Sequence, residues 1–141
     1  MFRAFIASLL LAGLSSFTFA QQLPADHAKR MKAGTELFRD SVRSALKQHC
    51  LKCHGGEKTR AGFDLSSRDR LLKGGDSGPV IDLKTATDSY LLQLVRHDDE
   101  PTMPPAADKL PKDLIANLQR WIELGAPYDN CLLYTSDAAD E

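Results

Sequence analysis

The sequence predicts a small all-α domain, and three amphipathic segments carry this prediction. Apolar residues recur at helical intervals in residues 36–49, 89–96 and 111–124. The segments between them are polar, rich in glycine and proline, and offer few candidate strands. We expect residues 21–35 to form a polar leader and residues 36–130 to form one domain, which is too small to have more than a thin core of its own.

The first predicted helix covers residues 36–49. Its apolar face consists of residues at intervals of four, three and one, namely Phe38, Val42, Ala45 and Leu46. Acidic residues fall early in the segment and basic residues late, as the helix dipole favours. We expect His49 to be a helix-end residue rather than a ligand.

The segment Cys50-Leu51-Lys52-Cys53-His54 follows this helix directly and has the pattern Cys-x-x-Cys-His. Two thiols at this spacing can add to the two vinyl groups of one porphyrin, and the adjacent imidazole can bind its iron. The motif therefore predicts one covalent haem c, bound through Cys50 and Cys53, with His54 as the proximal iron ligand. A zinc site would need a second pair of ligands. A thiol–disulfide pair, the other alternative, would need a strand–helix–strand setting.

Met103 is the predicted distal ligand of the iron, within Thr102-Met103-Pro104-Pro105. Proline fixes its own φ and biases the residue before it toward an extended backbone, so the thioether is carried on a stiff segment. Methionine is an established axial ligand of haem iron. Two alternatives remain, a methionine that only fills the core and a distal ligand supplied by His97.

A loop and one short helix are predicted after the motif. Gly55-Gly56 allow a sharp turn close to the site. Phe63 and Leu65 are expected to anchor the loop by burial. The short helix covers residues 67–72 and ends at Gly74-Gly75.

Two further helices complete the domain. The helix over residues 89–96 is expected to be capped by Thr87 or Asp88. Its apolar side consists of Tyr90, Leu91, Leu94 and Val95. The last helix covers residues 111–124, and we expect its Trp121 to be a core aromatic rather than an electron relay.

Both ends of the chain are expected to lie outside the working domain. Residues 1–20 have a positive start, an uncharged apolar run and small residues before a cleavage point, which together predict a secretory signal peptide. The apolar run is short for a membrane span, and an uncleaved anchor is the alternative. Residues 131–141 match the translation of a transposase adapter used in sequencing libraries, so we treat them, Cys131 included, as an adapter-derived artefact. We expect the natural chain to continue beyond about Asn130.

The charges of the chain are balanced, with 18 Lys and Arg against 19 Asp and Glu. There is no basic excess of the kind that nucleic-acid binding requires. We therefore expect no nucleic-acid partner, and no membrane span after cleavage of the signal peptide.

The run from Phe38 to Pro127 resembles the planctomycete-type cytochrome c domain. The matching pieces are Cys50-Leu-Lys-Cys-His-Gly55, Leu71-Leu-Lys-Gly-Gly-Asp-Ser-Gly-Pro79, Arg96-His-Asp-Asp99, Met103-Pro-Pro105, Leu118-Gln-Arg-Trp-Ile122 and Gly125-Ala-Pro127. The resemblance implies a class I cytochrome c-like fold in which the N- and C-terminal helices pack around a covalently attached haem. It assigns the thioether bonds to Cys50 and Cys53, the proximal position to His54 and the distal position to Met103. Pro111 departs from the usual serine or threonine helix cap.

These observations predict an electron-transfer module of an exported protein, periplasmic or extracellular, rather than an enzyme. Its haem iron, bound by one histidine and one methionine, would cycle between Fe(II) and Fe(III). The expected partner is a redox protein or the C-terminal domains of a longer exported chain. In the alternative interpretation, the domain relays electrons within a larger oxidoreductase or hydrolase whose catalytic part lies beyond this sequence.

Overall fold

The computed structural model describes residues 24–56 and 59–129. The predicted signal peptide, residues 1–20, and the predicted adapter-derived segment, residues 131–141, lie outside these ranges. Across the described ranges the chain is helical and contains no strand, apart from one isolated antiparallel bridge between Gly75 and Gly78. The all-α prediction is therefore confirmed for these residues.

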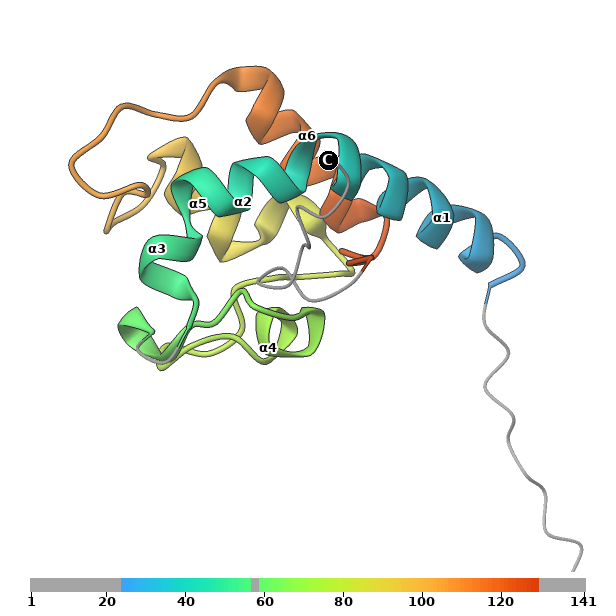
Figure 1. The fold of residues 1–141 in the computed structure, drawn as a ribbon, viewed down its shortest axis with the longest axis horizontal. Helices are drawn as coiled ribbons and strands as arrows, with labels where there is room; N and C mark the ends of the chain where they lie inside the picture. Colours follow the sequence, from blue (N-terminus) through green and yellow to red (C-terminus); the bar gives the residue numbers. More distant parts are fainter. Residues whose placement is uncertain (1–23, 57–58, 130–141) are drawn as a thin grey trace, which may run out of the picture.

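One long helical rod forms the N-terminal part of the domain (Figure 1). It consists of α1 (His27–Leu37), a π-helical turn η1 (Phe38–Val42) and α2 (Arg43–His49). The helix predicted over residues 36–49 therefore begins earlier, at His27 rather than at Glu36. Helix α1 packs closely on the C-terminal segment, because a Cβ added to Gly34 would lie 2.6 Å from Cγ of Pro127.

Shorter helical elements follow the rod. They are α3 (Leu51–His54), the 3₁₀ turn η2 (Arg60–Gly62), α4 (Arg68–Lys73), the 3₁₀ turn η3 (Ala86–Asp88), α5 (Tyr90–Arg96) and α6 (Lys112–Glu123). Helix α4 has the predicted ends: the Ser67 hydroxyl accepts a hydrogen bond from the Arg70 N–H, and Gly74 follows with a φ of +80°.

The predicted cap of α5 is wrong. Thr87 and Asp88 belong to η3, and α5 begins after Ser89. The Ser89 hydroxyl does not cap α5 either, because it bonds to the backbone of Asp82 instead, accepting from its N–H at 3.0 Å. The polar residues before α5 therefore fix the preceding loop rather than the free N–H groups of the helix.

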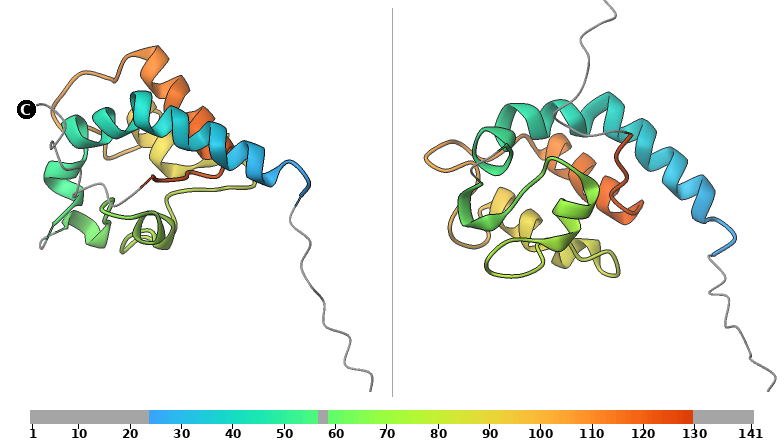
Figure 2. Two further views of the ribbon diagram at one scale, coloured as in Figure 1. Left: turned by 45° about the vertical axis from the view of Figure 1, so that its right-hand side comes forward. Right: turned by 60° about the horizontal axis from the view of Figure 1, so that its bottom comes forward.

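The core lies where α6 crosses the rod, as Figures 1 and 2 show, and α6 contacts α1, η1, α5 and η3. Trp121 of α6 is fully buried, as predicted, and its ring centroid lies 5.9 Å from that of Phe38. Tyr128 stacks on Phe38 at 4.5 Å. These three rings pack the N-terminal rod against α6 and the segment that follows it. Helix α3 and the loop between α5 and α6 lie outside this ring cluster.

A buried carboxylate fixes the loop before α4. Asp64 accepts a hydrogen bond from the Ser66 N–H at 2.7 Å and forms an ion pair with Arg70. Burial alone raises the pKa of Asp64, but the hydrogen bonds from Ser66 and Arg70 outweigh burial and hold this pKa below its ordinary value. The ionised form of Asp64 therefore stabilises the folded state.

We expect Asp64→Asn to lower the free energy of unfolding by about 1–3 kcal/mol at pH 7, because it removes a charged hydrogen-bond acceptor. The pKa of Asp64 is lower in the folded state, so its contribution is complete above the ordinary pKa of 3.8 and disappears as the pH falls below it. Urea unfolding at several pH values checks this, with the exposed Asp108→Asn as a control. A difference from the wild type that stays constant between pH 7 and pH 3 would contradict the assignment.

Candidate functional site

One cavity brings the predicted site residues together. All four line it: Cys50, Cys53, His54 and Met103. The first three come from the turn after α2 and from α3, whereas Met103 comes from the loop between α5 and α6, which lies at the same end of the molecule as α3 (Figures 1 and 2). The cavity volume of about 380 Å³ falls in the range of small-molecule sites.

The walls of this cavity are largely apolar. They include the side chains of Phe63, Leu65, Val80, Leu91, Leu94, Val95 and Leu110. Phe63 and Leu65 are buried, as predicted, and α5 turns its apolar side toward the cavity. A concave apolar surface with a few polar groups suits a flat hydrophobic ligand.

The local backbone explains why both thiols reach the same cavity. The N–H groups of Cys53 and His54 both donate to the Cys50 carbonyl, at 3.1 and 3.0 Å, so the motif forms a single helical turn. Gly56 then has a φ of +86°, a conformation that glycine adopts without steric cost. The His54 carbonyl accepts from the Leu65 N–H at 2.7 Å, which ties the motif to the loop that follows it.

The environment of Cys50 does not favour thiol redox chemistry. Burial, with a smaller effect from Cys53, raises the pKa of the Cys50 thiol to about 11. Reactive thiols in disulfide exchange have lowered pKa values instead. Both cysteines are free. Within the described part of the chain, no cluster of three or more His, Cys, Asp or Glu side chains could hold a metal ion.

His54 is held in the form that binds a metal. Burial lowers its pKa, while backbone groups of Phe63 and Arg60 act in the opposite direction, so the ring is neutral at pH 7. Its ring centroid lies 5.2 Å from that of Phe63. Its Nδ1 atom is buried and has no hydrogen-bond partner among the described residues. A neutral imidazole facing an apolar cavity is a suitable iron ligand.

The two candidates for the distal position differ in their relation to the cavity. Met103 is half-buried and lines it, and its N–H donates to the Leu94 carbonyl at 3.1 Å. His97 is not among the described residues that line the cavity. His97 follows α5 with a φ of +57°, and its Nε2 atom is buried without a described partner. The cavity therefore favours Met103 over His97.

Comparison with known proteins supports the same interpretation. Residues 50–107 match the family model described as Planctomycete cytochrome C. Over this segment the chain is similar to the planctomycete cytochrome c family. The match begins at the first cysteine of the motif and extends past Met103, so it includes most of the cavity, and it confirms the predicted resemblance. Searches of curated proteins and of solved structures found no significant match.

The cavity also contains residues that the sequence did not indicate. The turn at residues 75–78 lines the cavity, although Gly74-Gly75 were expected from the sequence only to end a short helix. A Cβ added to Gly75 would lie 2.5 Å from the Ala61 carbonyl oxygen, so glycine permits two backbone segments to approach here. The glycines in this stretch could have indicated from the sequence that two backbone segments approach each other here. Arg60 also lines the cavity, and no sequence pattern indicated this role. His49, which was expected only to end a helix, lines the cavity as well.

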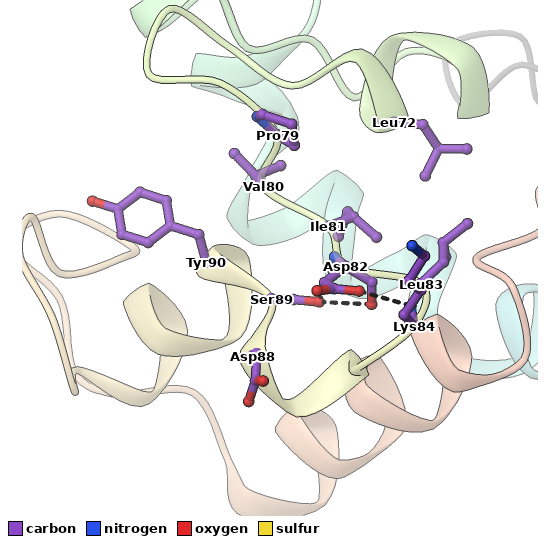
Figure 3. Close-up of a pocket in the computed structure, with 10 residues that line it drawn as sticks. All are labelled: Leu72, Pro79, Val80, Ile81, Asp82, Leu83, Lys84, Asp88, Ser89 and Tyr90. Carbon is purple, nitrogen blue, oxygen red and sulfur yellow. Dashed lines mark hydrogen bonds between the residues drawn. The ribbon is translucent and has the colours of Figure 1, made fainter.

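A second, more open groove adjoins the first cavity and is shown in Figure 3. It shares Val80 and Tyr90 with the first cavity and otherwise involves α4, η3 and the segment between them. It contains none of the predicted ligand residues. Elsewhere in the domain, no helix among the described residues is both long and apolar enough to cross a membrane.

Proposed function

We propose that this protein is an exported c-type cytochrome that carries single electrons on one covalently bound haem c. The single observation behind this is the cavity, where an apolar wall surrounds two thiols, a neutral imidazole and a thioether. These are the groups that attach and ligate a haem c. The family match supports the same cofactor class.

Each residue has a distinct role in this proposal. Cys50 and Cys53 would form the two thioether bonds, and their position on one helical turn lets both line the same cavity. His54 and Met103 would be the two protein ligands of the iron. When bound, the haem supplies one-electron exchange between Fe(II) and Fe(III).

The ligand set favours an electron carrier over an enzyme. If His54 and Met103 both bind the iron, they would leave it no open position for a substrate. Methionine is a soft ligand that raises the reduction potential relative to a pair of histidines. The role of the protein is then to exclude water from the apolar cavity and to expose one edge of the haem to a redox partner.

Export and partners follow from the sequence. The predicted signal peptide, residues 1–20, directs the chain to a periplasmic or extracellular site, where cysteines can be joined to haem. The electron partner is a separate redox protein or a C-terminal domain of a longer chain.

We expect Met103→Ala to open the sixth coordination position of the iron. The ferrous variant should bind carbon monoxide, which the wild type does not, and its reduction potential should fall because the soft ligand is lost. Visible spectra with and without carbon monoxide, together with a redox titration, check this result.

Met31→Ala is the matched control, because Met31 lies on α1 and is not among the described residues that line the cavity. His97→Ala tests the alternative ligand. Unchanged spectra in Met103→Ala, with carbon monoxide binding in His97→Ala, would assign the distal position to His97.

A further inference from the structure

Helix α5 fixes the segment that carries Met103 at two points. The Tyr90 hydroxyl donates to the Glu100 carbonyl at 3.0 Å, and the Met103 N–H donates to the Leu94 carbonyl at 3.1 Å. Tyr90 and Leu94 are four residues apart and therefore lie on one face of the helix. This face holds both ends of the short segment from Glu100 to Met103.

Other hydrogen bonds of the segment fix its shape but not its position. The Asp99 carboxylate accepts from the Glu100 N–H at 2.7 Å, and the Glu100 carboxylate accepts from the Thr102 N–H at 3.1 Å. Both bonds are local to residues 99–102. The hydrogen bonds that join the segment to α5 are the one from the Tyr90 hydroxyl to Glu100 and the one from the Met103 N–H to Leu94, and Met103 also packs against the apolar core.

The same face of α5 forms part of the cavity wall. Tyr90 and Leu94 both line the cavity that contains Met103. Tyr90 also lines the open groove, and Figure 3 shows its hydroxyl pointing away from Asp82 and Lys84 of that groove. The ring of Tyr90 thus contributes to the wall, while its hydroxyl serves the Met103 segment.

We propose that Tyr90 is a positioning residue for the distal ligand, which it holds at the cavity through the hydrogen bond from its hydroxyl to the Glu100 carbonyl. This inference rests on the proposed function, in which Met103 binds the iron. The bond from Met103 to Leu94 is formed by the backbone alone. Tyr90 is therefore the residue whose side chain affects how easily another ligand displaces Met103 from the iron.

The test is Tyr90→Phe in the haem-loaded domain, since it removes the hydroxyl and keeps the ring. The readout is the affinity of the ferric protein for added imidazole, which displaces methionine and abolishes the sulfur-to-iron charge-transfer band. One solvent-accessible hydrogen bond corresponds to about a threefold to tenfold change in an equilibrium. We expect imidazole to bind tighter by that factor in Tyr90→Phe.

Thr35→Val is the matched control, because the Thr35 hydroxyl also donates to a backbone carbonyl, that of Met31, at 2.9 Å, and neither residue is among the described residues that line the cavity. It should leave the imidazole affinity unchanged, even where urea unfolding shows equal destabilisation of both variants. An unchanged affinity in Tyr90→Phe, or an equal increase in Thr35→Val, overturns the role of Tyr90. A haem-loaded wild type without the charge-transfer band overturns the Met103 assignment itself, and the positioning role with it.

Discussion

The double variant Cys50→Ala/Cys53→Ala is expected to contain no covalently bound haem when it is produced in a host that matures c-type cytochromes. The two thiols lie one helical turn apart and line the same cavity. Each single variant removes one thioether bond and should retain haem through the other sulfur at lower yield. Intact mass and a pyridine haemochrome spectrum, measured on denatured protein, distinguish covalent from dissociable haem.

Cys131→Ala is the control for this pair, because Cys131 lies in the predicted adapter-derived segment, outside the described residues. It should attach haem like the wild type. The double variant should also be less stable than the loaded domain, because an apolar cavity of about 380 Å³ lacks its ligand and a group that binds only the folded state stabilises it. Covalent haem in the double variant would contradict the assignment of these cysteines.

Trp121→Ala is expected to lower the free energy of unfolding by about 3–5 kcal/mol, the usual cost of removing a large aromatic side chain from a core. Trp121 is fully buried, and its ring lies 5.7 Å from that of Tyr128. Its Nε1–H donates to the Pro127 carbonyl at 2.8 Å, so the substitution also leaves that carbonyl without its partner. Urea unfolding, followed by circular dichroism, measures the change.

Arg120→Ala, on the exposed side of the same helix, is the control for Trp121. Its ion pair with Glu123 is solvent-exposed and should contribute at most about 1 kcal/mol. Equal effects of the two substitutions would show that the crossing of α6 and the rod is not the main core. Trp121 is not among the described residues that line the cavity, so its loss should act on stability rather than on ligand identity.

The sequence predicted those parts of the site that depend on local structure. Cys50, Cys53 and His54 occupy one helical turn, so their spacing in the chain already defined their arrangement. The apolar spacing of α6 identified Trp121 as a core residue for a similar reason. Ser67 marked the start of α4 through its capping hydroxyl, and Gly74 marked the end through its positive φ.

Features that depend on distant parts of the chain were not predictable. In helix α1 only Gly34 is buried, while Leu37 is partly buried, so its amphipathic pattern is weak, and its packing on Pro127 is visible only in the fold. The contribution of Arg60 to the cavity depends likewise on the path of a loop. The hydrogen bond from Tyr90 to Glu100 joins a helix to a loop whose conformation no local pattern specifies.

The central claim is that one haem is attached to the sulfurs of Cys50 and Cys53. The most direct measurement is the intact mass of the wild-type protein, produced with a cytochrome maturation system and treated under denaturing conditions with a thiol-alkylating reagent. The account predicts the mass of the chain plus one haem and one alkyl group, the latter on Cys131, with neither Cys50 nor Cys53 alkylated. A colourless protein with the mass of the polypeptide plus three alkyl groups, two of them on Cys50 and Cys53, would contradict it.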